Sequence, residues 1–366
     1  MASLVNPSHT FWRGKRVLVT GHTGFKGTWL ALWLKQLGAV PLGLSLAPET
    51  EPSLAALTDL ERHVETVRGD IRDAAFVSEA IARLAPEIVL HLAAQTLVRR
   101  SYDEPALTFQ TNVMGTINVL EAVRRTPPVR AVVVVTSDKC YENREWHWPY
   151  REDEAMGGYD PYSASKGCAE LVTSAWRRSY LAKPGVDGQT VGVASVRAGN
   201  VIGGGDWAID RLIPDCMRAL SAGRPVSIRN PHATRPWQHV LEPLSGYLLL
   251  AERLWKDNPA FAEGWNFGPV IEDAQPVSEV VAQVTALWGD DARWELIGGD
   301  HPHEAGFLAV DSSKARSRLG WRPRLGLGEA LAWTTEWYKR HYGGEPAERL
   351  VLEQIGRFES LKGDIR

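Results

Sequence analysis

The stretch Arg16-Val-Leu-Val-Thr-Gly-His-Thr-Gly-Phe-Lys-Gly27 decides the fold class of this chain. It begins with an apolar run typical of a buried strand, and Gly21, Gly24 and Gly27 stand where such a strand turns into a helix. Glycines suit that turn because the chain bends sharply, a phosphate can approach the bare backbone, and the helix packs closely on the strand. With an amphipathic segment following at 25–37, the pattern favours a dinucleotide-binding turn over an ordinary strand-to-helix turn.

The first half of the chain repeats this rhythm of strand and helix. Apolar runs rich in Val, Ile and Leu predict further strands at 40–46, 64–68, 88–93, 131–137 and 190–197. Amphipathic segments between these runs predict helices at 74–84, 106–125 and 161–180. This alternation is typical of the α/β class, and we expect a doubly wound parallel sheet of the Rossmann type.

The rhythm changes after Gly199, where a glycine cluster at 203–205 is followed by many prolines and short mixed segments. We therefore expect a dinucleotide-binding domain at 1–198 and a smaller lobe at 199–366 that mainly binds substrate, although later strands can still join the sheet. The charged stretch 343–366 is expected to lie at the periphery.

Length and charge exclude several classes of protein. A chain of 366 residues corresponds to about two structural units of typical size. Its net charge of −3 provides no broad positive field for nucleic acid or an anionic membrane. No apolar run approaches the about 20 residues of a membrane span, and the polar opening 1–10 lacks the apolar core of a signal peptide. We expect a soluble, cytoplasmic protein that binds neither nucleic acid nor membrane.

Cysteine and tryptophan usage narrows the class further. The three cysteines, Cys140, Cys168 and Cys216, are widely spaced and form no Cys-x-x-Cys pair, which excludes a disulfide scaffold and predicts no metal site. The 15 tryptophans are scattered along the chain, so we expect them to fill the core and interfaces rather than form a stacking platform.

The adenosine end of the predicted dinucleotide site departs from the usual pattern. An acid is expected at the end of the second strand, about 20 residues beyond the glycines, to bind the ribose of NAD, but Ser45 stands there. No arginine near that position suits the 2′-phosphate of NADP, so NAD is favoured. Glu49 or Glu51 either reaches the ribose or is simply solvated. Asp70, which follows the third strand, either accepts from the adenine amine or caps the next helix.

The segment Tyr162-Ser-Ala-Ser-Lys166 carries the main catalytic candidates. A phenol and an ammonium four residues apart share one face of the predicted helix. A neighbouring cation stabilises a phenolate and lowers the pKa of tyrosine, as a base acting on a sugar hydroxyl requires. The preceding strand ends in Thr136-Ser-Asp-Lys139, so both segments should meet at the carboxyl ends of strands, where such sheets bind ligands. The Ser-x-x-Lys motif of penicillin-binding enzymes also fits, but the rest of that motif set is absent.

With these motifs, residues 15–330 resemble the extended short-chain dehydrogenase/reductase family. The resemblance lies in Thr-Gly-His-Thr-Gly-Phe-Lys-Gly at 20–27, Gly69-Asp70, Leu92-Ala-Ala94, Asn112, and Tyr162 with Lys166. Within the family the chain is similar to nucleotide-sugar 4,6-dehydratases, in particular those acting on CDP-glucose, through Gly21 to Lys26, Thr136-Ser-Asp-Lys-Cys-Tyr141, Gly203-Gly-Gly-Asp-Trp207 and Arg235-Pro-Trp-Gln-His239. The cofactor residues that follow from this resemblance are Gly21, His22, Gly24, Phe25, Lys26, Gly27, Ser45, Asp70, Ile71, Ala93, Ala94, Tyr162 and Lys166. His22 and Lys26 would touch the cofactor phosphates, with a solvated lysine as the alternative.

The resemblance also implies a reaction. Tyr162, assisted by Lys166, would take the proton of the sugar's C4 hydroxyl while hydride passes to NAD, and Ser137 would hydrogen-bond the same oxygen. Asp138 would then protonate the departing C6 hydroxyl as general acid. The related dTDP-glucose enzymes carry glutamate as the C5 base where this chain has Lys139. Three roles are therefore open for Lys139. It is the C5 base, which requires it to lose its own proton first, or its charge stabilises the enolate. Alternatively, it simply pairs with Asp138.

For the substrate, the resemblance implies that Asn200, Arg211 and Arg235 bind the diphosphate, although each arginine alone also suits a surface ion pair. It further implies a homodimer or dimer of dimers built through the helices at 106–125 and 161–180, and a role in making the deoxysugars of surface polysaccharides such as lipopolysaccharide O-antigen. Two other functions stay open, namely a nucleotide-sugar 4-epimerase, which needs no acid at Asp138, and a non-catalytic dinucleotide-sensing protein.

Overall fold

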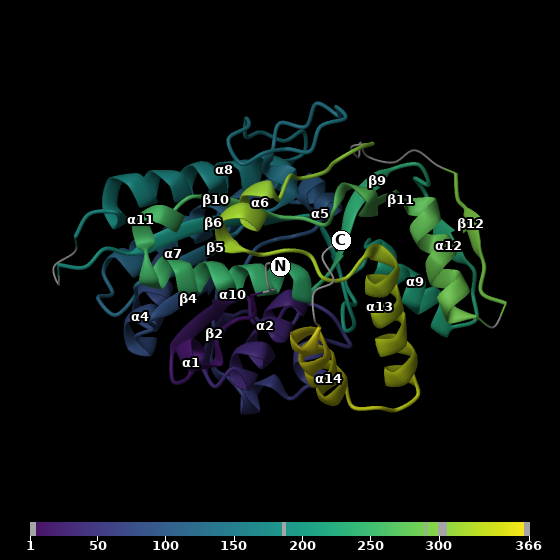
Figure 1. Cartoon of the computed structure of the whole chain (residues 1–366), viewed down its shortest axis with the longest axis horizontal. Coiled ribbons are helices and arrows are strands. Elements are labelled where there is room, and N and C mark those ends of the chain that lie inside the picture. The colour runs from purple at the N-terminus through teal and green to yellow at the C-terminus, as the bar shows by residue number, and fades with distance from the viewer. Residues whose placement is uncertain (1–4, 185–187, 290, 299–305, 362–366) are drawn as a thin grey trace.

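A parallel sheet of seven strands, in the order β10-β6-β5-β4-β1-β2-β3, forms the centre of the molecule (Figure 1). The computed structural model describes residues 5–184, 188–289, 291–298 and 306–361. The strands of this sheet are β1 (Arg16–Thr20), β2 (Val40–Ser45), β3 (Glu65–Arg68), β4 (Ile88–His91), β5 (Ala131–Val135), β6 (Gly192–Ala198) and β10 (Gly264–Phe267). All neighbouring pairs run parallel, so the predicted fold class is confirmed.

The helices cover both faces of this sheet and continue into the C-terminal half. They are α1 (His9–Trp12), α2 (Phe25–Gln36), α3 (Leu54–Leu57), α4 (Ala74–Leu84), α5 (Val98–Asp103), α6 (Pro105–Phe109), α7 (Gly115–Arg124), α8 (Pro161–Trp176), α9 (Leu212–Ser221), α10 (Leu241–Lys256), α11 (Asn258–Phe261), α12 (Val277–Trp288), α13 (Leu327–Tyr342) and α14 (Ala347–Ser360). The helix expected at 106–125 is α6 and α7 joined by a π turn at Gln110–Met114, and a second π turn at Arg177–Leu181 extends α8.

The register of the sheet brings the predicted site residues to one edge. Thr20, the last residue of β1, lies opposite Leu44 of β2 on one side and His91 of β4 on the other. The chain passes from β1 outward to β2 and β3, and then crosses back to β4 on the opposite side of β1. Such a reversal of strand order opens a crevice at the carboxyl ends of the strands, where ligands of doubly wound folds bind.

The second half of the chain builds two small sheets and also completes the large one. One small sheet has the order β11 (Ala274–Pro276), β9 (Thr234–His239) and β7 (Asn200–Ile202), and the other pairs β12 (Trp294–Leu296) with β8 (Val226–Ile228). Of these strands, β9, β11 and β12 lie with α9, α12 and α13 on the right of Figure 1. The edge strand β10, which the sequence patterns did not locate, returns to pair with β6. The large sheet therefore contains one strand from beyond residue 198.

Helices α2 and α10 form the centre of the core between the large sheet and the C-terminal helices. Residues 27–34 of α2 are all buried, so this helix is apolar on every side. Tryptophans fill the spaces around these helices, and the most deeply buried are Trp12, Trp29, Trp33, Trp265, Trp321 and Trp337. The expectation that tryptophans serve the core is therefore confirmed for these positions.

The expectation for the C-terminal stretch was wrong. Helix α14 buries Leu350, Val351, Ile355 and Phe358 in the main core and packs against α2. Its charged residues occupy the opposite face, as in an amphipathic helix, and this polar face dominates the composition of the segment. The part of the tail at 362–366 lies outside the described residues.

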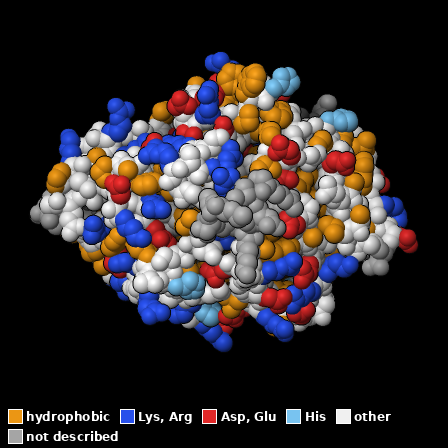
Figure 2. Space-filling view, in the orientation of Figure 1, with side chains coloured by type: hydrophobic (Ala, Val, Ile, Leu, Met, Phe, Trp, Pro, Cys, Tyr) orange, Lys and Arg blue, Asp and Glu red, His pale blue; other side chains and the backbone are white. Residues whose placement is uncertain are grey.

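On the surface, positive and negative side chains are intermingled across the face shown in Figure 2, with hydrophobic side chains scattered among them. None of the helices described is long and apolar enough to cross a membrane. The three cysteines are all free thiols.

Candidate active site

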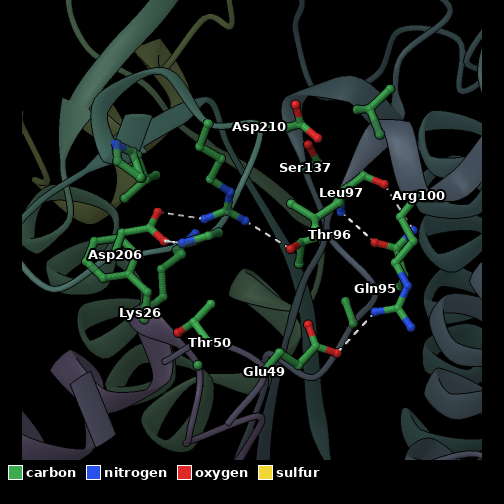
Figure 3. A pocket seen from close by; sticks show the side chains of 18 of the residues that line it. Lys26, Glu49, Thr50, Gln95, Thr96, Leu97, Arg100, Ser137, Asp206 and Asp210 are labelled. Carbon is green, nitrogen blue, oxygen red and sulfur yellow. Dashed lines mark hydrogen bonds and ion pairs between the residues drawn. The ribbon is translucent and has the colours of Figure 1, made fainter. Parts of the chain in front are cut away.

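A cavity of about 880 Å³ lies at the carboxyl ends of the strands of the large sheet. The glycine turn after β1 and the loops after β2 to β6 line one side of it, and β7, β8, β9 and the turn before α9 line the other. Every residue that the sequence singled out as catalytic, cofactor-binding or substrate-binding lines this cavity, except His22 and Glu51, the alternative to Glu49 at the ribose. Figure 3 shows side chains from both sides pointing into it.

The glycine turn has the shape of a phosphate cradle. Gly21 has a φ of +71°, and a Cβ there would lie 2.8 Å from the backbone of Ala93. A Cβ on Gly27 would lie 2.2 Å from the carbonyl oxygen of Gly21, so only glycine fits. Helix α2 starts at Phe25 with Gly24 as its cap, no side-chain hydrogen bond at that cap and no acid in its first turn. The first N–H groups of α2 and the positive end of its dipole are thus left to a ligand, which fits the diphosphate of a dinucleotide.

The imidazole of His22 lies away from the cavity, contrary to the expected phosphate contact. Its Nε2 is 3.1 Å from Oγ1 of Thr66, and its ring lies over Gly43, where a Cβ would approach within 2.4 Å. Burial lowers the pKa of His22 to about 4, so the ring is neutral. The glycine turn directs this side chain beneath strands β2 and β3, where it supports the turn from below.

Lys26 points into the cavity at the catalytic end. Its Nζ donates to the hydroxyl of Tyr247 on α10 at 3.4 Å. Burial, together with the charges of Arg211 and Lys166, lowers the pKa of Lys26 to about 7, whereas the charge of Asp138 acts in the opposite direction. The solvated lysine considered for this position is therefore not what the structure places there.

At the adenosine end, hydroxyls and ion pairs take the place of the usual acid. Ser45 at the end of β2 is 2.6 Å from Oγ1 of Thr23, which brings two hydroxyls together. The carboxylate of Asp70 accepts from both the guanidinium and the backbone N–H of Arg72. These contacts hold the pKa of Asp70 below its usual value. Asp73, not Asp70, caps helix α4. Glu49 pairs with the guanidinium of Arg100 at 3.3 Å across the mouth of the cavity (Figure 3).

The segment after β5 places a carboxyl group in a dry pocket. Ser137 caps a short 3₁₀ turn at Asp138–Cys140, and its Oγ donates to Oδ1 of Asp138 at 3.0 Å. Asp138 is 3% exposed, and its Oδ2 has no hydrogen-bond partner among the described residues. Burial raises the pKa of Asp138, against the opposing effects of Lys139, Ser137 and Arg235. A carboxyl group in this state retains its proton more readily, which suits a general acid.

Tyr162 and Lys166 lie in the first turns of α8, where Asp160 caps the helix and Pro161 occupies its first position. Both side chains are buried. Lys166 Nζ donates to the carbonyl oxygen of Val135 at 3.3 Å, and burial lowers the pKa of Lys166 to about 8.

The expectation that Lys166 lowers the pKa of Tyr162 was wrong, because in this structure the pKa of Tyr162 is raised. Burial raises the pKa of Tyr162 to about 12, and this effect outweighs a hydrogen bond with Ser137 that acts in the opposite direction. The charge of Asp138 also raises it, because a second negative charge nearby disfavours the phenolate.

A buried ion pair fixes β5, β6 and α8 behind these catalytic candidates. Both oxygens of Glu170, one turn beyond Lys166, accept from the guanidinium of Arg197 at 2.8 and 2.9 Å. Glu170 also accepts from the hydroxyls of Thr136 and Ser195. Thr136 directly precedes Ser137, so the network ties the catalytic end of β5 to the helix that carries Tyr162.

We expect Arg197→Met to destabilise the protein by about 3–5 kcal/mol, because it leaves the carboxylate of Glu170 buried without its charge partner. Urea unfolding followed by circular dichroism would measure the loss. The double variant Glu170→Leu with Arg197→Met removes both charges and should recover part of the stability. Equal stability of wild type and Arg197→Met would contradict the prediction.

The proposed diphosphate ligands lie along the wall of the cavity that the second half of the chain supplies. Asn200 begins β7, and Arg235 on β9 is buried close enough to Asp138 to lower its pKa. Arg211 bridges the cavity, because its guanidinium donates to Asp206 and to Thr96, each at 2.9 Å. Asp206 and Thr96 lie on opposite sides of this guanidinium in Figure 3.

Sequence reasoning missed several residues of this wall. Tyr247 on α10 lies behind the wall, where its hydroxyl contacts Lys26 although it does not itself line the cavity, and no local motif marks it. Asp210 accepts from Arg229 at 3.0 Å and lies 3.6 Å from Arg99, so three distant segments meet there. Only the position of Asp210 next to Arg211 offered a signal. Within the part of the chain that the structure describes, no three His, Cys, Asp or Glu side chains gather as a metal site.

Most of the chain is similar in sequence to a known protein family and to known enzymes. Residues 18–334 match the family model described as GDP-mannose 4,6 dehydratase. The chain is 56% identical to a CDP-glucose 4,6-dehydratase of Salmonella typhimurium over 335 residues, which cover 92% of this chain and 93% of that protein. It is 28% identical to a UDP-glucose 4-epimerase of Mycolicibacterium smegmatis, over 88% of this chain and 98% of that one.

Among solved structures, the fold is similar to that of a dTDP-glucose 4,6-dehydratase from Streptomyces venezuelae with NAD bound. The TM-score is 0.76 at 24% identity, over 90% of this chain and 99% of the other. This likeness concerns the fold, and it agrees with the sheet order and the position of the cavity described above.

Proposed function

The chain belongs to the GDP-mannose 4,6 dehydratase family, and from that premise we propose that it is an NAD-dependent 4,6-dehydratase that converts CDP-D-glucose to CDP-4-keto-6-deoxy-D-glucose. The observation that carries this proposal is the identity, along nearly the whole chain, to the CDP-glucose 4,6-dehydratase of Salmonella typhimurium. The residue set of the cavity supports it, because a buried acid, tyrosine and lysine line the same cavity.

The cofactor site fits NAD. The glycine cradle and the open N-terminus of α2 suit its diphosphate, and the paired hydroxyls of Ser45 and Thr23 line the cavity, where their oxygens can accept from its ribose. The chemistry that NAD would supply when bound is hydride transfer, with C4 of the sugar as the donor and C6 as the final acceptor within one catalytic cycle. We assign residues 1–198 mainly to the cofactor and the later residues mainly to the nucleotide sugar.

The chain's own residues then move the protons. Tyr162 takes the proton of the C4 hydroxyl, and Lys166 and Ser137 stabilise the resulting negative charge. Oxidation at C4 acidifies the hydrogen at C5, which leaves as a proton to a base, and a proton is returned to C5 when the hydride reaches C6. Asp138, whose burial favours its protonated form, donates its proton to the departing C6 hydroxyl, so water leaves. Asn200, Arg211 and Arg235 hold the diphosphate and so fix the sugar above these groups.

Lys139 stands where the reaction needs a group at C5, either as the base or as a charge that stabilises the enolate. Lys139→Arg separates these roles, because guanidinium keeps the charge but does not accept a proton. The base role predicts a fall in kcat of about 10²–10⁴-fold, whereas the stabilising role predicts a loss of less than about tenfold. Exchange of the C5 hydrogen with deuterated solvent, followed by mass spectrometry, measures the step directly.

The experiment that tests the function is incubation of the purified protein with NAD and, separately, the glucose esters of CDP, dTDP, UDP and GDP. Product mass distinguishes the reactions, because the dehydratase removes one water and a 4-epimerase leaves the mass unchanged. We expect loss of water from CDP-glucose. An isomer without loss of water would move the assignment to the epimerase, and the absence of any product would favour a dinucleotide-sensing protein.

The epimerase reading is not favoured, because identity to the epimerase is half that to the dehydratase. A non-catalytic dinucleotide sensor would not need Ser137, Tyr162 and Lys166 in one pocket. The buried acid at Asp138 adds to this argument, since epimerisation at C4 expels no hydroxyl and so needs no group that protonates one.

We also propose that the protein forms a homodimer, or a dimer of dimers, through the layer of helices α6 to α8. Phe109 on α6, Met114 in the following π turn and Leu171 on α8 are large apolar side chains exposed on this layer. Exposed apolar side chains on adjoining helices suit a helix-to-helix interface. We place the enzyme in the cytoplasm, where its product would supply deoxysugars for surface polysaccharides such as lipopolysaccharide O-antigen.

A further inference from the structure

A cluster of one acid and two arginines lies in the lining of the cavity, next to Arg211, one of the proposed diphosphate ligands. Asp210 directly precedes Arg211, Arg229 directly follows β8, and Arg99 belongs to α5. All of these residues line the cavity, and Figure 3 shows Asp210 among its side chains. A nucleoside base is joined to the diphosphate through one ribose. Asp210 is the neighbour of Arg211 in the cavity lining, so a base joined to a diphosphate on Arg211 is within the reach of one nucleoside from Asp210.

The carboxylate of Asp210 is held firmly but only on one side. Both arginine contacts go to Oδ1, from Arg229 at 3.0 Å and from Arg99 at 3.6 Å. Among the described residues, the hydrogen bond to this carboxylate goes to Oδ1 and not to Oδ2, and the side chain is 34% exposed. Asp210 also has a φ of +59°, a backbone conformation that residues other than glycine rarely adopt and that persists only where the surroundings fix it. One oxygen is thus available to a ligand at a fixed place.

We propose that Asp210, together with Arg229, selects cytosine over uracil and thymine in the nucleotide sugar. The inference rests on the proposed function and identifies the side chains that recognise the base of the nucleotide sugar. Cytosine presents an amine donor beside two acceptors, whereas uracil and thymine present a carbonyl oxygen beside an N–H donor. A carboxylate only accepts and a guanidinium only donates, so the pair complements the edge of cytosine. Against uracil or thymine, the carboxylate faces a carbonyl oxygen and the guanidinium faces an N–H group.

The test is the Asp210→Asn variant, because an amide both accepts and donates and so suits either base. The dissociation constants of CDP and UDP, measured by calorimetry, isolate base reading from chemistry. We expect wild type to prefer CDP, and the variant to reduce that preference by about tenfold or more. The ratio of kcat/KM for CDP-glucose over UDP-glucose should fall by a similar factor.

Controls separate base reading from a general change of charge. Glu336→Gln removes a carboxylate that forms an ion pair with Arg340 on α13, outside the cavity. It should leave the ratio of the dissociation constants of CDP and UDP unchanged. Arg229→Gln is a second variant of the cluster and should also lower the preference for CDP. Thermal melting verifies that each variant folds.

Equal changes in affinity for CDP and UDP in Asp210→Asn would overturn the inference, since Asp210 would then only position Arg99 and Arg229. No preference for CDP in wild type would overturn it as well. If wild type removes no water from CDP-glucose, the proposed function fails, but the binding ratio still tests Asp210 independently.

Discussion

Replacing Tyr162 by phenylalanine is expected to lower kcat for loss of water from CDP-glucose by about 10³-fold or more, with little change in KM. The phenol is the group that takes the C4 proton, and phenylalanine keeps its shape in the buried pocket while removing the hydroxyl. Burial holds the pKa of Tyr162 near 12, so another charge must favour its ionised form during the reaction. An oxidised NAD held in this cavity would supply such a positive charge.

Steady-state assays with mass detection measure this loss. Tyr159→Phe is a suitable control, because that tyrosine lies three residues earlier and is exposed. It should keep wild-type activity. A Tyr162→Phe variant with near wild-type kcat would show that another group removes the C4 proton. A variant that instead raises KM alone would place Tyr162 in substrate binding rather than in chemistry.

The parts of the fold that follow from local pattern could be predicted from the sequence. The helix expected at 74–84 is α4, and the strand expected at 16–20 is β1. Their residues show clear helical or strand periodicity and clear turn signals at their ends. Strand β10 could not be found in this way, because its four residues pair at the edge of the sheet only after a long excursion of the chain. Composition alone does not locate helix α14 in the core, because its many charged residues lie on one face and conceal the buried face opposite.

The residues of the candidate site also differ in whether local sequence pattern predicts them. Gly21, Gly24 and Gly27 could be identified because a turn between adjacent elements dictates them. The cluster around Asp210 depends on contacts between segments that are distant along the chain, which no local motif records. The electrostatic expectation for Tyr162 failed for a related reason. Spacing along a helix shows which charges lie close, but it does not give the burial that outweighs them.

Asp138→Asn is expected to stop loss of water while leaving the earlier steps in place. Asparagine has nearly the same size and still accepts from Ser137, but it has no carboxyl proton to give to the C6 hydroxyl. The rate of water loss should therefore fall by about 10²–10⁴-fold. Because Tyr162 and Lys139 are unchanged, the C5 hydrogen should still exchange with solvent.

Incubation in deuterated water, followed by mass spectrometry, distinguishes this outcome from a general loss of activity. We expect recovered CDP-glucose to carry deuterium at C5 and to retain its C6 oxygen. The isosteric change also removes a buried acid whose pKa is raised, so a folded-state defect would appear as a shift in melting temperature rather than in this labelling pattern. If C5 exchange is lost together with dehydration, Asp138 acts before the elimination. Its unpartnered oxygen would then serve C5 chemistry, and Lys139 would be left the electrostatic role.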